Sequence, residues 1–422
     1  MSWLLELLLL CVFVAADGTK RSTSDVERQV KMTTCELVAD MGYHCETRKA
    51  TTEDGYVVEI DRVRENAKAA ACDRETCDNP VLLVPGMLDD SASWFLNQPS
   101  QSAGFMLADK GYDVWTMNTR EITNRCEHKE LSHSDPRYWE WSFNEIGKFD
   151  VAAAIDLVLT TTGASTLVIL AFSQGFTSSL VLLSTKPEYN AKVDLLMGYG
   201  PVANVSHTGY PLSALLFFSD LIFPVIDPFG KRGYFSFTGA AEATGKPLCS
   251  ILDGGICSAT LFIALAATPE QVNKTRTPVY MAHTYQATSI KNLHHLVQVA
   301  KSKRFAMYDN GKVDNLLKYG KTEPPEYPLE RISVPAALFS AVRDKIANPV
   351  DVADLVRALD AGVVLNYVLP MRNFHHDDFI LSCKAAHVLH DVMIATLANY
   401  TSNDADEEEH VPDGAYISDN LG

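Results

Sequence analysis

Short apolar runs alternate along this chain with longer segments that can form helices. The runs hold four to seven residues, rich in aliphatic and β-branched side chains, which is typical of strands buried on both faces of a parallel sheet. They lie at residues 81–84, 112–117, 167–170, 193–199, 334–339 and 363–369. Residues 149–159 have apolar positions at helical spacing and lead into the third run. The pattern predicts an α/β fold with a mostly parallel sheet and helices on both faces.

The pattern changes at two places outside these strands. Ahead of them, residues 52–55 predict a turn, and the alternating residues after it predict a strand, as in a hairpin. From about 203 to 325 the chain has strongly apolar segments, but Asp220, Pro224 and Pro228 exclude a membrane span in the longest of them. We expect a mainly helical cap over 203–325, inserted into a core formed by 17–202 and 326–400. These apolar residues either pack the cap's own interior or line a lipid site, and both can hold together.

The two ends of the chain differ from the rest. Residues 1–16 are apolar and end in small side chains, which predicts a signal peptide cleaved after Ala16, although Glu6 interrupts the run and no basic residue precedes it. The run is too short for a comfortable membrane anchor, so we expect no transmembrane segment in the mature chain. Residues 401–422 are acidic and predict a solvated, disordered tail. A signal peptide implies a secreted or lysosomal protein.

Charge, cysteines and glycosylation sequons agree with that location. The 422 residues carry a net charge of −17, which argues against binding to nucleic acid or to anionic membranes by electrostatics. Removal of the signal leaves eight of nine cysteines, an even number that suggests disulfides without defining their pairing. Cys72 lies close to Cys77, and Cys249 close to Cys257. Glycosylation candidates are Asn204, Asn273 and Asn399.

The pentapeptide Ala171-Phe-Ser-Gln-Gly175 carries the first chemical signal. A strand-like run enters it and a helix-compatible segment leaves it, which is the context of a nucleophile elbow. Small residues suit the sharp turn, which exposes the Ser173 hydroxyl above the sheet. The alternative is an ordinary turn serine.

An elbow serine needs a base and an orienting acid, and in this fold they follow it in the order acid, then histidine. Asp344 comes just after the run at 334–339, and His375 and His376 come just after the last run. Asp344 could instead cap the helix that begins near residue 348. Spacing alone does not decide between the two histidines. His283, His294 and His295 fall in the expected cap and are interpreted as structural.

The site also needs donors for the oxyanion of the tetrahedral intermediate. The amide of Gln174 follows the nucleophile and is the first candidate. Residues 81–94 supply the second, because Gly86 lets the backbone approach the substrate and Met87 offers its amide.

Together these motifs resemble the acid lipase family, which contains gastric and lysosomal acid lipases and their invertebrate relatives. The resemblance spans roughly residues 30–400 and includes 52–56, 85–88, Ser91, Trp94, 111–115, Asn118, Arg120, 143–145, Phe149, Asp150, 173–175, 201–203, Thr288, Ser289, Asn292, Asp344, Asn348, Pro349, His376, Asp378 and Phe379. It implies an α/β-hydrolase fold and a Ser173, Asp344, His376 triad.

The resemblance also implies a cap disulfide between Cys249 and Cys257. The activity it implies is hydrolysis of neutral lipid esters, triacylglycerol or sterol ester, through an acyl-enzyme. It implies no metal or organic cofactor and a cap that contacts the lipid interface transiently.

The chain departs from the family at three places. Pro85 replaces a histidine before Gly86, Ala171 and Phe172 replace a glycine and a histidine at the elbow, and Glu121 replaces a glycine. We expect these changes to alter substrate or rate and to leave the chemistry intact. A catalytically silenced lipid-binding or storage protein is the main alternative. A different serine hydrolase, such as a thioesterase or peptidase, is the other.

Overall fold

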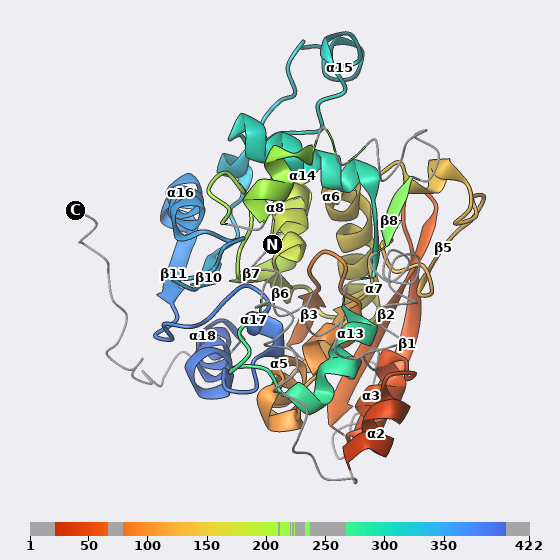
Figure 1. Ribbon diagram of the computed structural model, residues 1–422, viewed down its shortest axis with the longest axis vertical. Helices are drawn as coiled ribbons and strands as arrows, with labels where there is room; N and C mark the ends of the chain where they lie inside the picture. Colours follow the sequence, from red (N-terminus) through yellow and green to blue (C-terminus); the bar gives the residue numbers. More distant parts are fainter. Residues whose placement is uncertain are drawn as a thin grey trace, which may run out of the picture.

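The computed structural model describes residues 22–65, 79–209, 212–219, 221, 223, 233–236, 267–284 and 286–401 (Figure 1). Its strands are β1 (Tyr43–Thr51), β2 (Tyr56–Glu65), β3 (Pro80–Val84), β4 (Asp113–Met117), β5 (Cys126–His128), β6 (Leu167–Phe172), β7 (Val193–Tyr199), β8 (Tyr234–Ser236), β9 (Ala287–Ser289), β10 (Ala336–Ser340) and β11 (Val363–Val368).

Helices connect and cover these strands. They are α2 (Ser22–Gln29), α3 (Thr34–Asp40), α5 (Ala103–Asp109), α6 (Phe143–Glu145), α7 (Ala152–Thr162), α8 (Gln174–Thr185), α9 (Leu212–Phe217), α13 (Thr277–His283), α14 (Ile290–Ser302), α15 (Lys312–Tyr319), α16 (Pro349–Leu359), α17 (Asp378–Leu381) and α18 (Asp391–Thr401). A π-helical turn, η5 (Ile146–Val151), joins α6 to α7. Within the described residues, none of the helices combines the length and hydropathy that crossing a bilayer needs.

The central sheet has the strand order β1-β2-β4-β3-β6-β7-β10-β11, and β5 pairs with β2. The five pairings from β4 to β11 are parallel, whereas β2 runs antiparallel to both β1 and β4. The prediction of a mostly parallel sheet in an α/β-hydrolase fold is confirmed. The hairpin at its start is present too, because Thr51 pairs with Val57 across the turn at 52–55.

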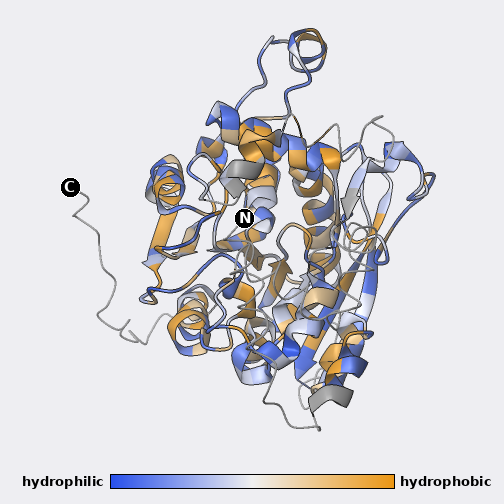
Figure 2. Ribbon diagram, viewed as in Figure 1, coloured by the Kyte–Doolittle hydropathy of each residue, from blue (hydrophilic) through white to orange (hydrophobic). Residues whose placement is uncertain are grey.

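Alternation along the strands divides the core into two layers. On β3, Leu82 and Val84 pack with α7, α8 and α16 on one face, whereas Val81 and Leu83 pack with α3, α5 and α18 on the other. Successive side chains of a strand point to opposite faces, so a strand covered on both faces must be apolar throughout. The edge strand β1 is covered less and is largely hydrophilic (Figure 2).

A long excursion separates two strands that are direct neighbours. β7 pairs with β10, and between them the chain forms α9, α13, α14 and α15 and a small antiparallel sheet of β8 and β9. In Figure 1, α14 lies across the end of the molecule near α6 and α8, and α15 projects beyond it. Sequence patterning did not reveal the short strands β5, β8 and β9.

Several predictions fall outside the described residues: the signal peptide at 1–16, the tail from 402 onward, the Cys249–Cys257 disulfide and the Cys72/Cys77 pair. Within the described part, Cys35 and Cys45 form a disulfide that ties α3 to β1. Cys126 and Cys383 have free thiols.

Candidate active site

Ser173 occupies the sharp turn between β6 and α8. Its φ of 52° lies in the left-handed region, which is costly for a residue with a side chain and is typical of a nucleophile elbow. The Ser173 amide donates to the Tyr199 carbonyl oxygen of β7 (3.0 Å), which anchors the turn to the sheet. A Cβ on Gly175 would lie 2.5 Å from the carbonyl oxygens of Val84 and Pro85, so only glycine fits there.

His376 and Asp344 lie in line with this serine. Nε2 of His376 is 2.7 Å from Oγ of Ser173, and Nδ1 is 2.8 Å from Oδ2 of Asp344. His376 and Asp344 are almost fully buried, with 3% and 2% of their surfaces exposed. The structure therefore brings together the three residues named from the sequence, with the spacing of a nucleophile, a base and an orienting acid.

The other oxygen of Asp344 is also used. Oδ1 accepts hydrogen bonds from the amides of Ile346 (2.8 Å) and Ala347 (2.9 Å), which fix the carboxylate just beyond the end of β10. Asn348 caps α16 instead, so the capping role considered for Asp344 belongs to another residue.

Gly200 has a φ of +50°, and a Cβ there would lie 3.1 Å from the His376 ring, so glycine leaves room for the imidazole.

The electrostatics of His376 and His375 differ. Burial lowers the pKa of His376, but the charge of Asp344 and its hydrogen bond outweigh burial, and the net pKa is raised. The pKa of His375 is lowered by partial burial and by the nearby charge of Lys345. The backbone amide of His375 donates to Asp378 (2.7 Å), whose buried carboxyl group also binds the amide and hydroxyl of Thr268. Asp378, a residue for which sequence reasoning found no role, therefore holds the histidine loop.

The two backbone amides expected from the sequence as oxyanion donors are not used by the fold. Within the described part of the chain, neither the Met87 amide nor the Gln174 amide has a hydrogen-bond partner. The Met87 loop is held by His283, whose Nδ1 lies 2.9 Å from Oδ2 of Asp90 and whose carbonyl oxygen accepts from the Asp90 amide. His283 is thus a structural residue, as the sequence interpretation expected, and the loop that it holds was not foreseen from the sequence.

Gly86 is required for a reason that the sequence did not show. A Cβ at this position would lie 2.8 Å from the Phe172 ring. The backbone of the loop reverses at Leu88, whose φ is 72°. Phe172, one of the departures from the family pattern, therefore fills the space beside Gly86 and lies tilted against the His376 ring, with ring centroids 4.9 Å apart.

Glu121, another departure, is fully buried and contacts Gln174, the residue after the nucleophile. Its carboxyl group contacts the Gln174 carboxamide nitrogen (3.2 Å) and the Thr288 hydroxyl (2.6 Å). Burial raises the pKa of Glu121 to about 7, and hydrogen bonds from Thr288, Gln174 and Thr119 limit the rise. The sequence indicated a new negative charge here but not its contact with Gln174.

The three glycosylation candidates differ in how exposed their side chains are. Asn399 is exposed on α18, Asn204 is partly buried with its amide 3.3 Å from the Lys303 carbonyl oxygen, and Asn273 caps the 3-10 turn η7 (Lys274–Arg276). Among the described residues, one group has liganding atoms close enough to hold a metal ion: Cys35, Cys45 and Asp61. Its cysteines form the disulfide, so this group is not a metal site.

Comparison with known proteins agrees with the fold. Residues 34–98 match the family described as a partial alpha/beta-hydrolase lipase region. The chain is 31% identical over 408 residues to Lipase member N of Homo sapiens, covering 95% of this chain and 100% of the relative. It is 31% identical over 374 residues to gastric triacylglycerol lipase of Bos taurus, covering 88% and 92%. A solved structure from Sulfolobus solfataricus shares the fold, with a TM-score of 0.50 and 14% identity over 85% of this chain and 95% of that one.

Proposed function

Because this chain belongs to the acid lipase family and is a carboxylic ester hydrolase, we propose that it cleaves neutral lipid esters with Ser173 as nucleophile, His376 as base and Asp344 as the orienting acid. The observation that carries the proposal is the contact of Ser173 Oγ with Nε2 of His376 at 2.7 Å, in line with the contact of Nδ1 with Asp344 at 2.8 Å.

The mechanism follows from these contacts. The Asp344 carboxylate keeps a proton on Nδ1, so Nε2 is free to accept the Ser173 proton as Oγ attacks the ester carbonyl carbon. The amides of Met87 and Gln174 donate to the oxyanion that forms. The tetrahedral intermediate collapses, and His376 gives the proton to the departing alcohol. Water, activated by the same histidine, then hydrolyses the acyl-enzyme and restores Ser173.

Exposed apolar residues in the 203–325 region support contact with a lipid interface. Phe217 is 75% exposed and Leu221, four positions further on, is 70% exposed. Exposed apolar side chains on a soluble protein are normally scattered singly, so two so close together suggest a contact surface. Leu317 on the projecting helix α15 is 82% exposed. Burial of such side chains in a lipid surface removes apolar area from water, which favours adsorption. We infer a cap that meets neutral lipid, triacylglycerol or sterol ester, at an interface.

Secretion or delivery to a lysosome is part of the proposal. It rests on the predicted signal peptide at 1–16 and on the sequons at Asn204, Asn273 and Asn399. Expression in a secretory cell line tests it through the N-terminal residue of the mature chain and through mobility shifts on removal of N-glycans. A mature chain that begins at Met1 and carries no glycan would contradict it.

The activity is tested by labelling the mature protein with a fluorophosphonate probe and by measuring hydrolysis of an ester series of increasing acyl length. Wild type should be labelled and should cleave long-chain esters, and Ser173→Ala should do neither. Ser179→Ala is the matched control, because Ser179 lies on the same helix and its hydroxyl donates to the Gly175 carbonyl oxygen. It should keep both properties.

The same experiment distinguishes the alternatives. Folded wild type that neither labels nor turns over would contradict the proposal and indicate a silenced lipid-binding protein. Labelling with turnover confined to thioesters or peptides would indicate another serine hydrolase.

A further inference from the structure

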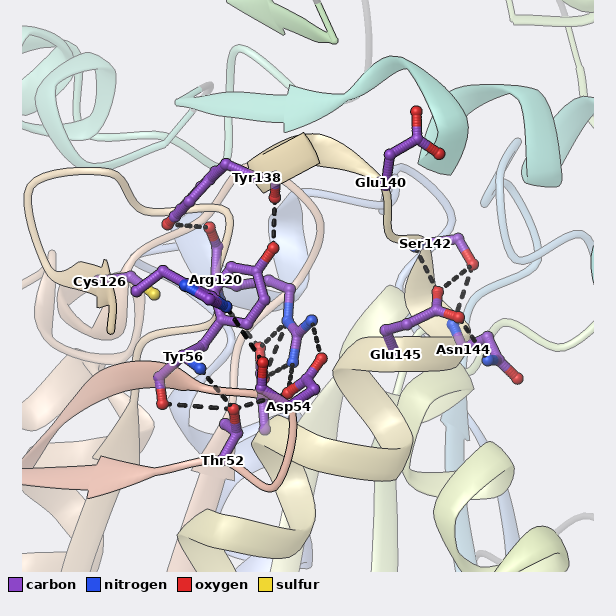
Figure 3. A network of polar contacts seen from close by, with 12 residues as sticks. Thr52, Asp54, Tyr56, Arg120, Cys126, Tyr138, Glu140, Ser142, Asn144 and Glu145 are labelled. Atoms are coloured by element: carbon purple, nitrogen blue, oxygen red, sulfur yellow. Dashed lines mark hydrogen bonds and ion pairs between the residues drawn. The ribbon is translucent and has the colours of Figure 1, made fainter. Parts of the chain in front are cut away.

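Glu121 lies where it can act on the oxyanion site without touching the substrate. It follows β4 in a loop, and its neighbour Arg120 fixes that loop through ion pairs and a backbone hydrogen bond. The Arg120 guanidinium pairs with Asp150 (2.7 Å) and Asp54 (2.7 Å) and lies 3.8 Å over the Tyr56 ring (Figure 3). The Arg120 amide also donates to Asp150 (2.9 Å). A loop held this firmly gives its next residue little freedom to move.

From that loop, the Glu121 carboxyl group reaches the first residue of α8. Its Oε2 lies 3.2 Å from Nε2 of Gln174, and Oε1 of Gln174 accepts from Nδ2 of Asn292 at 2.7 Å. Asn292 is fixed in turn, because its Oδ1 accepts from the Phe143 amide (2.8 Å). The Gln174 side chain is therefore held at both ends by buried groups. Its backbone amide is the one proposed above as an oxyanion donor.

We propose that Glu121 is a positioning residue for ester hydrolysis: through the Gln174 carboxamide it fixes the first turn of α8 and so aims the Gln174 amide at the oxyanion. This inference rests on the proposed function. Donors aimed in advance are effective because they need no reorganisation as charge develops. A side chain too short to reach Gln174 would leave the carboxamide without one of its partners.

The protonated carboxyl group suits a developing oxyanion better than the carboxylate does. A carboxylate at this position repels the negative charge that develops on the substrate oxygen, whereas a protonated acid does not. The titratable groups that act electrostatically with Glu121 are Asp150 on η5 and Asp89 in the 86–90 loop, and Arg120 precedes it in its own loop. Its contacts from α8, β9 and α14 are the neutral residues Gln174, Thr288 and Asn292. Burial among these groups raises the pKa of Glu121 to about 7.

Three variants and a control test the assignment by steady-state kinetics on a soluble ester from pH 4.5 to 8.5. Glu121→Gln keeps the length and neutrality of the protonated acid. At pH 5.5 it should stay within about threefold of wild type in kcat. Glu121→Ala and Glu121→Asp cannot reach Gln174 and should lose roughly tenfold in kcat, with KM changed less than about twofold. Glu145→Gln alters a partly buried glutamate, which completes the capping box of α6, and should match wild type.

The pH profile separates positioning from general stability. Wild type should lose kcat as the pH rises through about 7, where Glu121 ionises, and Glu121→Gln should lack this decline. Three results would overturn the assignment: Glu121→Ala with wild-type kcat, Glu121→Gln as slow as Glu121→Ala at pH 5.5, or the same alkaline decline in Glu121→Gln.

Two further outcomes complete the test. If Glu121→Ala does not fold, Glu121→Gln and Glu121→Asp carry the comparison, with fluorophosphonate labelling counting the competent sites. Wild type that neither labels nor turns over would defeat the proposed function and this inference together. Active wild type with unaffected Glu121 variants would defeat this inference alone.

Discussion

The Phe172 ring lies against the His376 imidazole, with ring centroids 4.9 Å apart and planes 32° from parallel. Phe172 closes one side of the space in which the imidazole must keep its place between Ser173 and Asp344. The same ring also occupies the space beside Gly86. A residue that departs from the family pattern thus supports two parts of the site by packing alone.

Phe172→Ala should therefore lower both stability and turnover. Removal of a buried phenyl ring costs about 3 kcal/mol in the free energy of unfolding, and the freed imidazole should lower kcat roughly fivefold. Phe105→Ala is the control, because Phe105 is equally buried in the core and contacts Phe95 and Tyr43 rather than the site. Denaturant melts should show similar losses for both. Equal kcat values in the two variants would contradict a role in holding His376.

The two adjacent histidines should behave oppositely on substitution. His376→Ala removes the base and should lower kcat by on the order of 10⁴-fold. His375→Ala should stay within about threefold, because the backbone amide of His375, not its ring, makes the contact with Asp378. Hydrolysis of a short-chain ester measures both. Loss of activity in both variants to the same degree would show that the pair was assigned wrongly.

Asp344→Asn should slow the reaction and shift the acidic limb of its pH–rate profile. The neutral amide no longer favours the imidazolium or fixes its tautomer, so kcat should fall by roughly 10²- to 10⁴-fold. Without the carboxylate, burial governs His376, so its pKa should fall and the acidic limb of kcat/KM should shift to lower pH.

Asp351→Asn is the matched control for Asp344→Asn. Asp351 is also a buried carboxylate paired with a histidine, at 2.7 Å from Nδ1 of His207. Its substitution should leave the pH profile unchanged. A shift of the acidic limb in Asp351→Asn, or none in Asp344→Asn, would argue against the assigned triad.

Arg120→Ala should be among the most destabilising changes in the chain. It leaves Asp150, whose side chain is fully buried, without its cationic partner, which typically costs about 3 to 5 kcal/mol. Arg304→Ala breaks an ion pair with Glu326 at the surface and should cost less than about 1 kcal/mol. Equilibrium urea unfolding compares the two, and similar losses would contradict the importance of the buried network.

Glu121→Gln should change how stability depends on pH. The pKa of Glu121 is raised to about 7 in the folded protein, so the folded state binds more protons than the unfolded state between about pH 4.5 and 7. The contribution of Glu121 to the free energy of unfolding of the wild type is therefore fully present below about pH 4.5 and is lost as the pH rises to about 7. The stability of Glu121→Gln relative to wild type should thus rise by up to roughly 3 kcal/mol between pH 5 and 8.

Comparison of the two proteins removes other titrations from this measurement. Burial lowers the pKa of His295 and of His390 to about 4, which opposes the effect of Glu121 at acidic pH, but both histidines are common to wild type and variant. Urea melts at pH 5, 6.5 and 8 give the difference directly. A difference that does not change with pH would show that Glu121 is ionised in the folded protein across the range.

The sequence by itself determined the strands of the sheet and the order of the candidate catalytic residues along the chain. Strands that must be apolar on both faces are visible as continuous runs, and the run at 193–199 coincides with β7. Ser173, Asp344 and the histidine pair each follow such a run. Because the carboxyl ends of parallel strands share one edge of the sheet, local signals were enough to place them together.

Local patterning did not decide between neighbours or reveal contacts across long separations; the family resemblance pointed to His376, and the tertiary structure gives the physical reason. His375 and His376 have the same chemistry and differ by one position, and the direction of the loop, held by Asp378, turns one of them toward Ser173. The contact of Glu121 with Gln174 joins loops from β4 and β6, and no local pattern encodes it. Such contacts depend on how strands are ordered in the sheet and on what fills the space between them, which the packing of the whole chain determines.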